Sequence, residues 1–415
     1  MSSLMTRSGR LYSSVESREQ RSIGSILSPS QDQWDPYANA RSTFVELCET
    51  IDKYNIPSVE IHNPGADFIT TKKFKPPSIF PLGSGSTADV VRHITGNEFD
   101  HIVPSGSVIA LKKFRYRCGN VPGFTTTEAD KCELYKVILR EIRTFYNHHL
   151  HGHPNIAQLL FVGWQLHNPF PLLGIEFGDH GSLEFILREA KFGPTSLQKR
   201  HLTLDLVLGL SAIHRAGFIH GDLKPDNILV MAHEDPKRQL VAKMIDFGGA
   251  SSDKAVHFTP LWSAPEVMNK DNDIVWAKAD VYSLGLVIAS LWARPKIKEF
   301  RLTLNSCILS SIAPIGVPDH LLDRILFAAK SSLSFCIKLL KLHMTECVDL
   351  GGFDTSELFD ILASMLHPHF WQRQDTKCLV QDFVSFGEML GRDIRKTILQ
   401  NLNPLRKSQG SEPTL

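Results

Sequence analysis

The chain has 415 residues, which is enough for two or three domains with their own cores. Lys and Arg number 45 and Asp and Glu 44, so the formal net charge is +1. This balance excludes a strong global attraction to nucleic acid or to an anionic membrane. No apolar run reaches the roughly 18 residues of a membrane span, and MSSLMTRSGR lacks the apolar core of a signal peptide. We therefore expect a cytoplasmic protein, with the nucleus left open, that has no nucleic-acid partner and no membrane span.

The first 72 residues differ in composition from the rest of the chain. Residues 1–40 are rich in Ser, Arg and Gln and have almost no apolar periodicity, so burial would not offset the entropy of ordering them. In STFVELCETIDKY (42–54), apolar residues recur at helical spacing, and Thr43 with Glu46 fits a capping box. We expect 1–72 to be a largely disordered extension with one helix at 42–54, and 401–415 to be a polar tail.

From about residue 78 the sequence pattern is that of strands. IFPLGSGSTADVVRHIT and SVIALKKFRY predict an antiparallel pair, and residues 127–147 predict a long helix. Two more strand candidates lie near 157–165 and 171–177, and after FGDHGSL (177–183) the pattern is mainly helical. The sequence therefore predicts a small β-rich lobe followed by a larger α-rich lobe.

Two features of the first lobe are suited to binding phosphate. In LGSGSTADVV the glycines at 83 and 85 would let backbone N–H groups approach phosphate oxygens, although a plain hairpin turn has the same composition. Lys112 stands in the apolar strand VIALKKF, where an unpaired charge is costly, and strand alternation directs Lys113 to the opposite face. Glu141 shares an apolar helix face and would meet Lys112, unless both are solvated charges.

Polar side chains cluster in two segments of the second lobe. FIHGDLKPDNILV places a carboxylate at Asp222, a cation at Lys224 and an amide at Asn227 directly before an apolar run. In MIDFGGASS, Asp246 ends an apolar strand, a position that suits Mg²⁺. The histidines of HHLHGHP (148–154) favour a turn over a zinc site, because no cysteine is nearby.

The order of these features is that of protein kinases. The glycine-rich hairpin, the strand lysine, the helix glutamate, HGDLKPDN, DFG and APE follow one another, and ADVYSLG (279–285) and Arg373 extend the match. The sequence resembles a eukaryotic-type serine/threonine protein kinase over residues 76–390. The resemblance implies an α+β, bilobal protein-kinase-like fold with a kinase domain at 76–400, divided into an N-lobe (76–177) and a C-lobe (178–400).

The resemblance also implies a role for each matching residue in the transfer of a phosphoryl group from ATP with Mg²⁺ to a protein substrate. Asp222 would be the base and Lys224 would neutralise the transferred group, while Asn227 and Asp246 would bind the metal. The residues implied at the ATP site are Leu82, Gly83, Gly85, Val90, Ala110, Lys112, Glu141, Glu176, Gly178 and Leu229, with Ile175 as gatekeeper. The residues implied to support the activation segment and the catalytic loop are His220, Phe247, Gly248, Thr259, Glu266, Asp280 and Arg373.

Three departures from the family pattern are visible. Ala88 replaces the third glycine of the loop, and its small side chain still leaves room for phosphate. Segment 294–365, with the strongly helical LLDRILFAAKSSLSFCIKLLKL, is longer than the family needs; we expect extra packing there, or a surface for a substrate or partner. Gly221 replaces an arginine that in many kinases binds a phosphate on the activation segment. We therefore expect activity that does not depend on phosphorylation of Ser251, Ser252, Thr259 or Ser263.

Two other interpretations remain open. A small-molecule phosphotransferase of the same fold would also have HGD, but such enzymes typically lack an APE segment and a lysine two residues after the base. A pseudokinase would serve as a binding module that keeps the fold without the chemistry, and a protein partner could bind through the N-terminal extension or segment 294–365. Pseudokinases usually lose one of three residues that are present in this chain: Lys112, Asp222 and Asp246.

Overall fold

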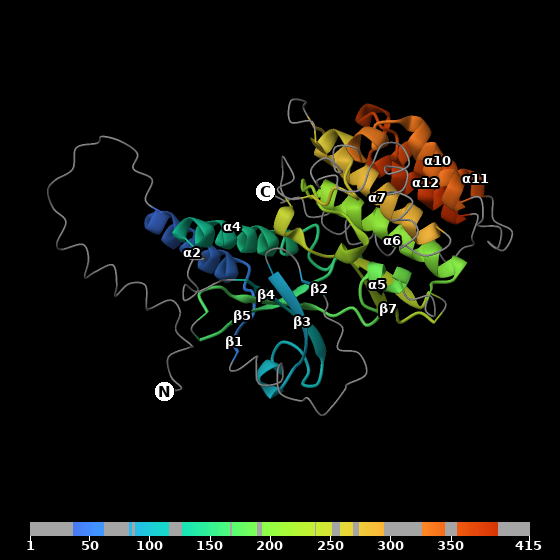
Figure 1. Ribbon diagram of the computed structural model, residues 1–415. Coiled ribbons are helices and arrows are strands. Elements are labelled where there is room, and N and C mark those ends of the chain that lie inside the picture. The colour runs from blue at the N-terminus through green and yellow to red at the C-terminus, as the bar shows by residue number, and fades with distance from the viewer. Residues whose placement is uncertain are drawn as a thin grey trace, which may run out of the picture.

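The computed structural model describes residues 36–61, 83–84, 88–115, 127–166, 168–188, 193–236, 238–250, 258–268, 274–293, 326–344 and 355–388. Figure 1 shows a β-sheet with two long helices beside it, and a larger, mainly helical part at the other end. The predicted two-lobed α+β architecture is confirmed.

The sheet has six strands in the order β1-β5-β6-β4-β3-β2. The strands are β1 (Ser58–Glu60), β2 (Gly83–Ser84), β3 (Ala88–Ile94), β4 (Val108–Phe114), β5 (Leu159–Trp164) and β6 (Leu172–Glu176). β3 and β4 form the predicted antiparallel pair, with Val90 opposite Lys112. β5 and β6 confirm the other two predicted strands.

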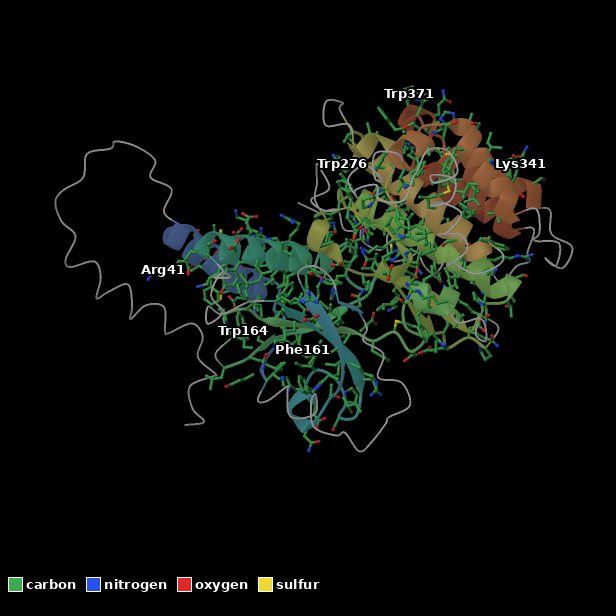
Figure 2. All side chains as sticks on the ribbon, in the orientation of Figure 1. Arg41, Phe161, Trp164, Trp276, Lys341 and Trp371 are labelled. Carbon is green, nitrogen blue, oxygen red and sulfur yellow. The ribbon has the colours of Figure 1, made fainter. Side chains whose placement is uncertain are left out.

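The two faces of the sheet have different coverings, because side chains alternate along a strand. On β4, Ile109 and Leu111 pack in a small cluster with Phe161, which Figure 2 labels, and with Phe99 of a short 3₁₀ helix. Phe114 belongs to the main core, together with the buried face of helix α4. Lys112 shares the face of Phe114 and is buried, whereas Lys113 is exposed, as the alternation predicts.

Helix α4 (Glu128–Phe145) confirms the predicted long helix at 127–147. Its start is capped by a reciprocal pair of hydrogen bonds between Thr127 and Asp130, and its first turn is acidic, which suits the positive end of the helix dipole. The buried face of α4 carries Ile138, Glu141, Ile142 and Phe145 at helical spacing. A glutamate is therefore carried on an otherwise apolar face.

Helix α2 (Pro36–Lys53) is longer than the helix expected at 42–54. Residues 36–40, expected to be disordered, belong to this helix, and it begins at a proline, whose missing N–H costs nothing in a first turn. The expected capping box is wrong: Thr43 lies inside the helix, with its hydroxyl 3.5 Å from Cys132 Sγ, and Glu46 binds Arg143 at 2.8 Å. Residues 1–35 and 62–72 lie outside the described residues.

Residues 36–61 are part of the first lobe. Helix α2 runs along α4 (Figure 1), with Leu47 fully buried and the Phe44 ring 5.7 Å from that of Tyr135. Strand β1 then pairs in parallel with β5, so that Ser58 lies opposite Val162. The sequence did not predict β1, because three residues are too few for an alternating pattern.

The second lobe is built around a buried helix. Its helices are α5 (Leu183–Arg188), α6 (Ser196–Arg215), α7 (Trp276–Trp292), α10 (Leu333–Met344), α11 (Thr355–Met365) and α12 (Thr376–Glu388), with the hairpin β7 (Ile228–Ala232) and β8 (Leu240–Met244). Short 3₁₀ helices lie at Pro225–Asn227, Phe247–Gly249, Pro265–Met268 and Phe370–Gln372. Every residue of α7 from Ala279 to Trp292 is buried, as expected for a helix that is apolar all round.

Segment 294–365 is described only in part, at 326–344 and 355–365. Residues 326–330 are helical, the helix is interrupted at Ser331 and Ser332, and α10 then packs against α7 and α11. The expected extra packing is therefore present in this part of the segment. Among the described helices, none has the length and hydropathy needed to cross a bilayer.

The loop between α4 and β5 is expected to make folding stability pH-dependent. Burial, and then the charges of Arg215 and Lys243, lower the pKa of His153 from 6.5 to about 4. Nδ1 of His153 accepts a hydrogen bond from the backbone N–H of Asn155 at 3.2 Å. Below pH 6.5 the unfolded chain gains a proton at this residue and the folded chain does not, so stability falls until the pH reaches about 4. Relative to neutral pH, His153 is expected to lower the free energy of unfolding by about 2 kcal/mol at pH 5 and by about 3 kcal/mol at pH 4.

Urea unfolding of the wild type and of His153→Asn at pH 7.5 and pH 5 measures this contribution. Asparagine keeps an acceptor near the position of Nδ1 and does not titrate, so the wild type should lose more stability than the variant between the two pH values. Parallel losses in the two proteins would contradict the assignment to His153.

Candidate active site

Three charged side chains from different elements meet between the lobes. Lys112 Nζ, from β4, donates to both carboxylate oxygens of Glu141 on α4 at 2.8 Å, and to Asp246 Oδ1 at 2.8 Å. The Glu141 side chain is fully buried, whereas the Asp246 side chain is 44% exposed. The predicted pairing of the strand lysine with the helix glutamate is therefore present, and the solvated alternative is wrong for both residues.

The electrostatics of this cluster favour the charged forms. Burial by itself would lower the pKa of Lys112, but the carboxylates of Glu141 and Asp246 outweigh burial and raise that pKa. Lys112 lowers the pKa of Asp246 to about 2, against the opposing effect of burial. Burial raises the pKa of Glu141, and Lys112 opposes this shift. At neutral pH the cluster thus contains a protonated lysine beside an ionised Asp246.

The backbone around Asp246 directs its carboxylate toward Lys112. Asp246 has φ 68° and ψ 69°, a left-handed conformation that aspartate adopts more readily than most residues. Phe247 follows and packs edge-on against Phe145 of α4, with ring centroids 5.2 Å apart. A Cβ at Gly248 would lie 3.2 Å from Val137, so glycine allows α4 to approach closely. Arg140 of α4 donates to the Gly248 carbonyl at 2.9 Å.

A second polar cluster surrounds Asp222. Thr259 Oγ1 donates to Asp222 Oδ1 at 2.6 Å, and Lys224 Nζ donates to Asp222 Oδ2 at 2.5 Å and to Thr259 Oγ1 at 3.0 Å. The amide of Asn227 donates to the Asp222 carbonyl at 2.8 Å. The structure therefore brings together four residues that the sequence analysis selected from two segments.

Asp280 of the buried helix α7 fixes the backbone of this loop. Its carboxylate accepts from the amides of His220 at 2.8 Å and Gly221 at 2.9 Å, and it lies 3.0 Å from Nε2 of His214. Gly221 has φ 79°, a conformation in which any side chain would be strained. The His220 ring lies 3.1 Å from the Ile245 carbonyl and packs beside Phe247, so it links the loop to the segment of Asp246.

Residues expected around the nucleotide lie on strands of both lobes, in the six-stranded sheet and in the β7-β8 hairpin. Val90 on β3 is opposite Lys112, Ala110 on β4 is opposite Ile175 on β6, and Leu229 lies on β7. A Cβ at Gly178 would lie 3.3 Å from Leu229 Cβ, so these two positions are adjacent. Gly83 pairs with Val90, whereas Leu82 and Gly85 lie outside the described residues.

The side chain of Glu176, one of the residues implied at the ATP site, has partners of its own. It accepts from Lys243 Nζ at 2.9 and 2.7 Å and from the backbone N–H of Gln158 at 2.9 Å. The contact with Lys243 links the end of β6 in the first lobe to β8 in the second.

Glu266 and Arg373, both implied by the resemblance to be supporting residues, form a buried ion pair. The Arg373 side chain is 0% exposed and that of Glu266 is 8% exposed. Arg373 donates to both carboxylate oxygens, at 2.5 and 2.9 Å, and to the carbonyls of His367, Pro368 and Lys278. These five bonds use every N–H of the guanidinium.

Several contacts of this site are not predictable from the sequence pattern. Arg140 binds the DFG segment, and His214 binds Asp280. Lys330 binds the backbone before APE. Arg140 and His214 stand in ordinary helical patterns, with no signal to separate them from surface residues. Lys330 lies in the apolar stretch RILFAAK, where a lysine after a hydrophobic run is the one available signal. Within the described chain, no three His, Cys, Asp or Glu side chains gather in a way that would hold a metal.

Comparison with known proteins agrees with this geometry. The family model of the protein kinase domain matches residues 81–384. The chain is similar to a mitogen-activated protein kinase kinase kinase, MCK1, of Pyricularia oryzae, with 32% identity over 40% of this chain and 11% of the relative. It is similar to the dual specificity testis-specific protein kinase 2 of Rattus norvegicus, with 33% identity over 51% of this chain and 33% of the relative. A probable serine/threonine-protein kinase of Dictyostelium discoideum, kinX, is 25% identical over 52% of this chain and 19% of the relative.

These matches span a third or less of the length of each relative. They therefore compare this chain with only a part of each relative. Since the family model covers most of the sequence, from the glycine-rich strand to α12, the chain belongs to the protein kinase domain family.

Proposed function

We propose that the chain is a serine/threonine protein kinase that transfers the γ-phosphate of ATP to a hydroxyl of a protein substrate. The observation that carries this proposal is the contact of Lys112 with both Glu141 and Asp246 at 2.8 Å. A kinase needs its phosphate-binding lysine and its metal-binding aspartate in place together. The serine/threonine specificity is inferred from Lys224 and Thr259, which both bind Asp222.

The donor set fits a magnesium ion. Asp246 is ionised, and Asn227 uses its amide nitrogen on the Asp222 carbonyl, which leaves its amide oxygen as the atom to bind a cation. Mg²⁺ is usually bound by one or two protein oxygen ligands together with substrate phosphates, so a larger acidic cluster is not required. When bound, Mg²⁺ with ATP supplies the phosphoryl group and neutralises its charge.

The protein residues have separate tasks in this proposal. Lys112 binds the α- and β-phosphates, and Glu141 orients the lysine. Asp222 orients the substrate hydroxyl and accepts its proton, while Lys224 stabilises the negative charge on the transferred group. Thr259 fixes both side chains, because its hydroxyl donates to Asp222 and accepts from Lys224.

Transfer of labelled phosphate from ATP with Mg²⁺ to a generic basic protein tests this function. The wild type should label the substrate on serine or threonine, and Lys112→Met should not, because methionine cannot bind phosphate. Equal background labelling by both proteins would favour a pseudokinase that serves as a binding module. Labelling of tyrosine as well would contradict the serine/threonine restriction, and labelling of a small-molecule hydroxyl alone would contradict a protein substrate.

We expect the activity not to depend on phosphorylation of the activation segment. Gly221 has no side chain with which to bind a phosphate, and the Thr259 hydroxyl is already bonded to Asp222 and Lys224. A phosphate on Thr259 would place a second negative charge beside Asp222 and disrupt this cluster. Treatment with a phosphatase should therefore leave kcat unchanged, while Thr259→Asp should be inactive.

The double variant Ser251→Ala, Ser252→Ala is the control for phosphorylation elsewhere in the segment. Both serines lie outside the described residues, and the variant should keep its activity. A loss of activity on dephosphorylation, with recovery after the segment is phosphorylated again, would contradict the expectation.

A protein partner at the N-terminal extension or at segment 294–365 remains a proposal. In both segments the described helices, α2 and α10, already pack against the kinase lobes. A partner would therefore bind the outer faces of these helices or the residues outside the described ranges.

A further inference from the structure

Lys330 is a buried lysine in segment 294–365, the part of the second lobe that the sequence predicts to be longer than the family needs. It ends the helical residues 326–330, and its side chain is 0% exposed. Its Nζ lies 5.8 Å from the ring centroid of Tyr282 and 5.6 Å from that of Phe327. Burial of a lysine is unfavourable unless its charge and its hydrogen bonds are satisfied, so the partners of Lys330 show what it stabilises.

Three hydrogen bonds of the Lys330 ammonium end on one short segment. Nζ donates to the carbonyls of Pro260 at 2.9 Å, Leu261 at 2.7 Å and Ser263 at 2.8 Å. An ammonium has three donors, and these three bonds use them all. A planar guanidinium directs its donors differently and is not expected to replace the lysine.

The segment bound by Lys330 is joined to the candidate base. Thr259 donates to Asp222 Oδ1 at 2.6 Å, and the Thr259 carbonyl accepts from the amides of Trp262 at 2.9 Å and Ser263 at 3.1 Å. Residues 259–263 therefore form one tight turn, with its hydroxyl on Asp222 and its carbonyls on Lys330. A shift of this turn would move Thr259 relative to Asp222.

The outer side of the same segment faces solvent. Phe258 is 38% exposed, and Thr259, Pro260 and Leu261 are half-buried, whereas Trp262 and Ser263 are buried. A substrate hydroxyl that reaches Asp222 must lie beside Thr259, so the residues next to that hydroxyl pass along 258–261. Lys330 supports this surface from inside the lobe and does not itself touch the substrate.

We propose that Lys330 is a positioning residue that holds segment 259–263 in the conformation that receives the protein substrate. This inference rests on the proposed kinase function. Loss of Lys330 should affect the binding of the protein substrate and not that of the nucleotide, because the three carbonyls that it binds lie after Thr259 and outside the cluster of Lys112, Glu141 and Asp246.

The test compares Lys330→Met with the wild type in the full chain. Methionine keeps the apolar stem against Tyr282 and Phe327 and removes the three donors. The expected result is a fall of about tenfold or more in kcat/KM for the protein substrate, since charged hydrogen bonds are lost from the turn. The KM for ATP should not change. Amide hydrogen exchange at residues 259–263 should become faster, with the rest of the lobe unaffected.

The matched control is Lys341→Met, which removes an exposed lysine from α10 (Figure 2) and should change none of these quantities. Lys330→Arg should not restore the wild-type KM for the protein substrate. If Lys330→Met does not accumulate as folded protein, Lys330→Gln, which keeps an N–H donor, serves the same comparison.

Three outcomes overturn the inference, and they are distinguishable. Equal losses in the kinetics of ATP and of the protein substrate, in proportion to lost folded protein, would make Lys330 merely structural. Unchanged kinetics with unchanged amide exchange would remove any role. A wild type that binds ATP but transfers no phosphate would refute the proposed kinase function itself, and with it this inference.

Discussion

Asp222→Asn is expected to lower kcat by about 10²–10⁴-fold, the usual contribution of a positioned general base. Asparagine has nearly the same shape and keeps an oxygen to accept from the Thr259 hydroxyl, but its amide cannot accept a proton. Lys224 also loses the carboxylate that it binds at 2.5 Å. The effect should appear in kcat, because in the proposed function Asp222 acts on the substrate hydroxyl and not on the nucleotide.

Steady-state kinetics with saturating ATP and Mg²⁺ measure this loss, and thermal unfolding confirms that the variant folds. Asp52→Asn makes the same chemical change at an exposed position near the end of α2 and should behave as the wild type. If Asp222→Asn kept kcat near the wild-type value, Asp222 would not be the base.

The second large effect is expected in stability. Arg373→Met should lower the free energy of unfolding by about 3–5 kcal/mol, because it leaves the carboxylate of Glu266 buried without its cation. The carbonyls of His367, Pro368 and Lys278 also lose their donor. Arg373→Lys should not restore stability, since lysine has three donors where arginine has five.

Urea unfolding measures both variants, and two further proteins sharpen the result. Arg143→Met breaks the exposed pair with Glu46, whose side chains are 45% and 47% exposed, and should cost less than about 1 kcal/mol. The double variant Glu266→Leu with Arg373→Met should recover part of the lost stability, because a buried ion pair can often be replaced by apolar side chains. Similar losses for Arg373→Met and Arg143→Met would show that burial of the pair is not what makes it important.

The expected losses of kcat in Asp222→Asn and of stability in Arg373→Met both depend on residues that the sequence identified. They also depend on distances that only the structure provides. HGDLKPDN and DFG identify Asp222 and Asp246 through the resemblance to protein kinases, which implies the roles of base and metal ligand. The contact of Lys112 with Glu141 was an inference from two patterns, a lysine in an apolar strand and a glutamate on an apolar helix face. The structure confirms it at 2.8 Å.

Helix α2 illustrates where local pattern failed. The spacing of Phe44, Leu47 and Ile51 predicts this helix correctly, but the spacing of Thr43 and Glu46 predicts a capping box that the helix does not have. In the fold both side chains instead meet partners on α4, Cys132 and Arg143, which are 89 and 97 residues away in sequence. A pattern within four residues cannot distinguish a cap from a tertiary contact at the same spacing.

The sequence by itself determined the order of the motifs and the two-lobed architecture, and its resemblance to protein kinases implied which residues meet in the candidate site. Local spacing is sufficient for the helices and strands, because their periodicity acts over short stretches. Only the tertiary structure decided that β1 joins the sheet, that α2 packs on α4, and that Lys330 binds the turn after Thr259. Each of these depends on contacts between residues distant in sequence, where burial and hydrogen-bond satisfaction select one partner among many.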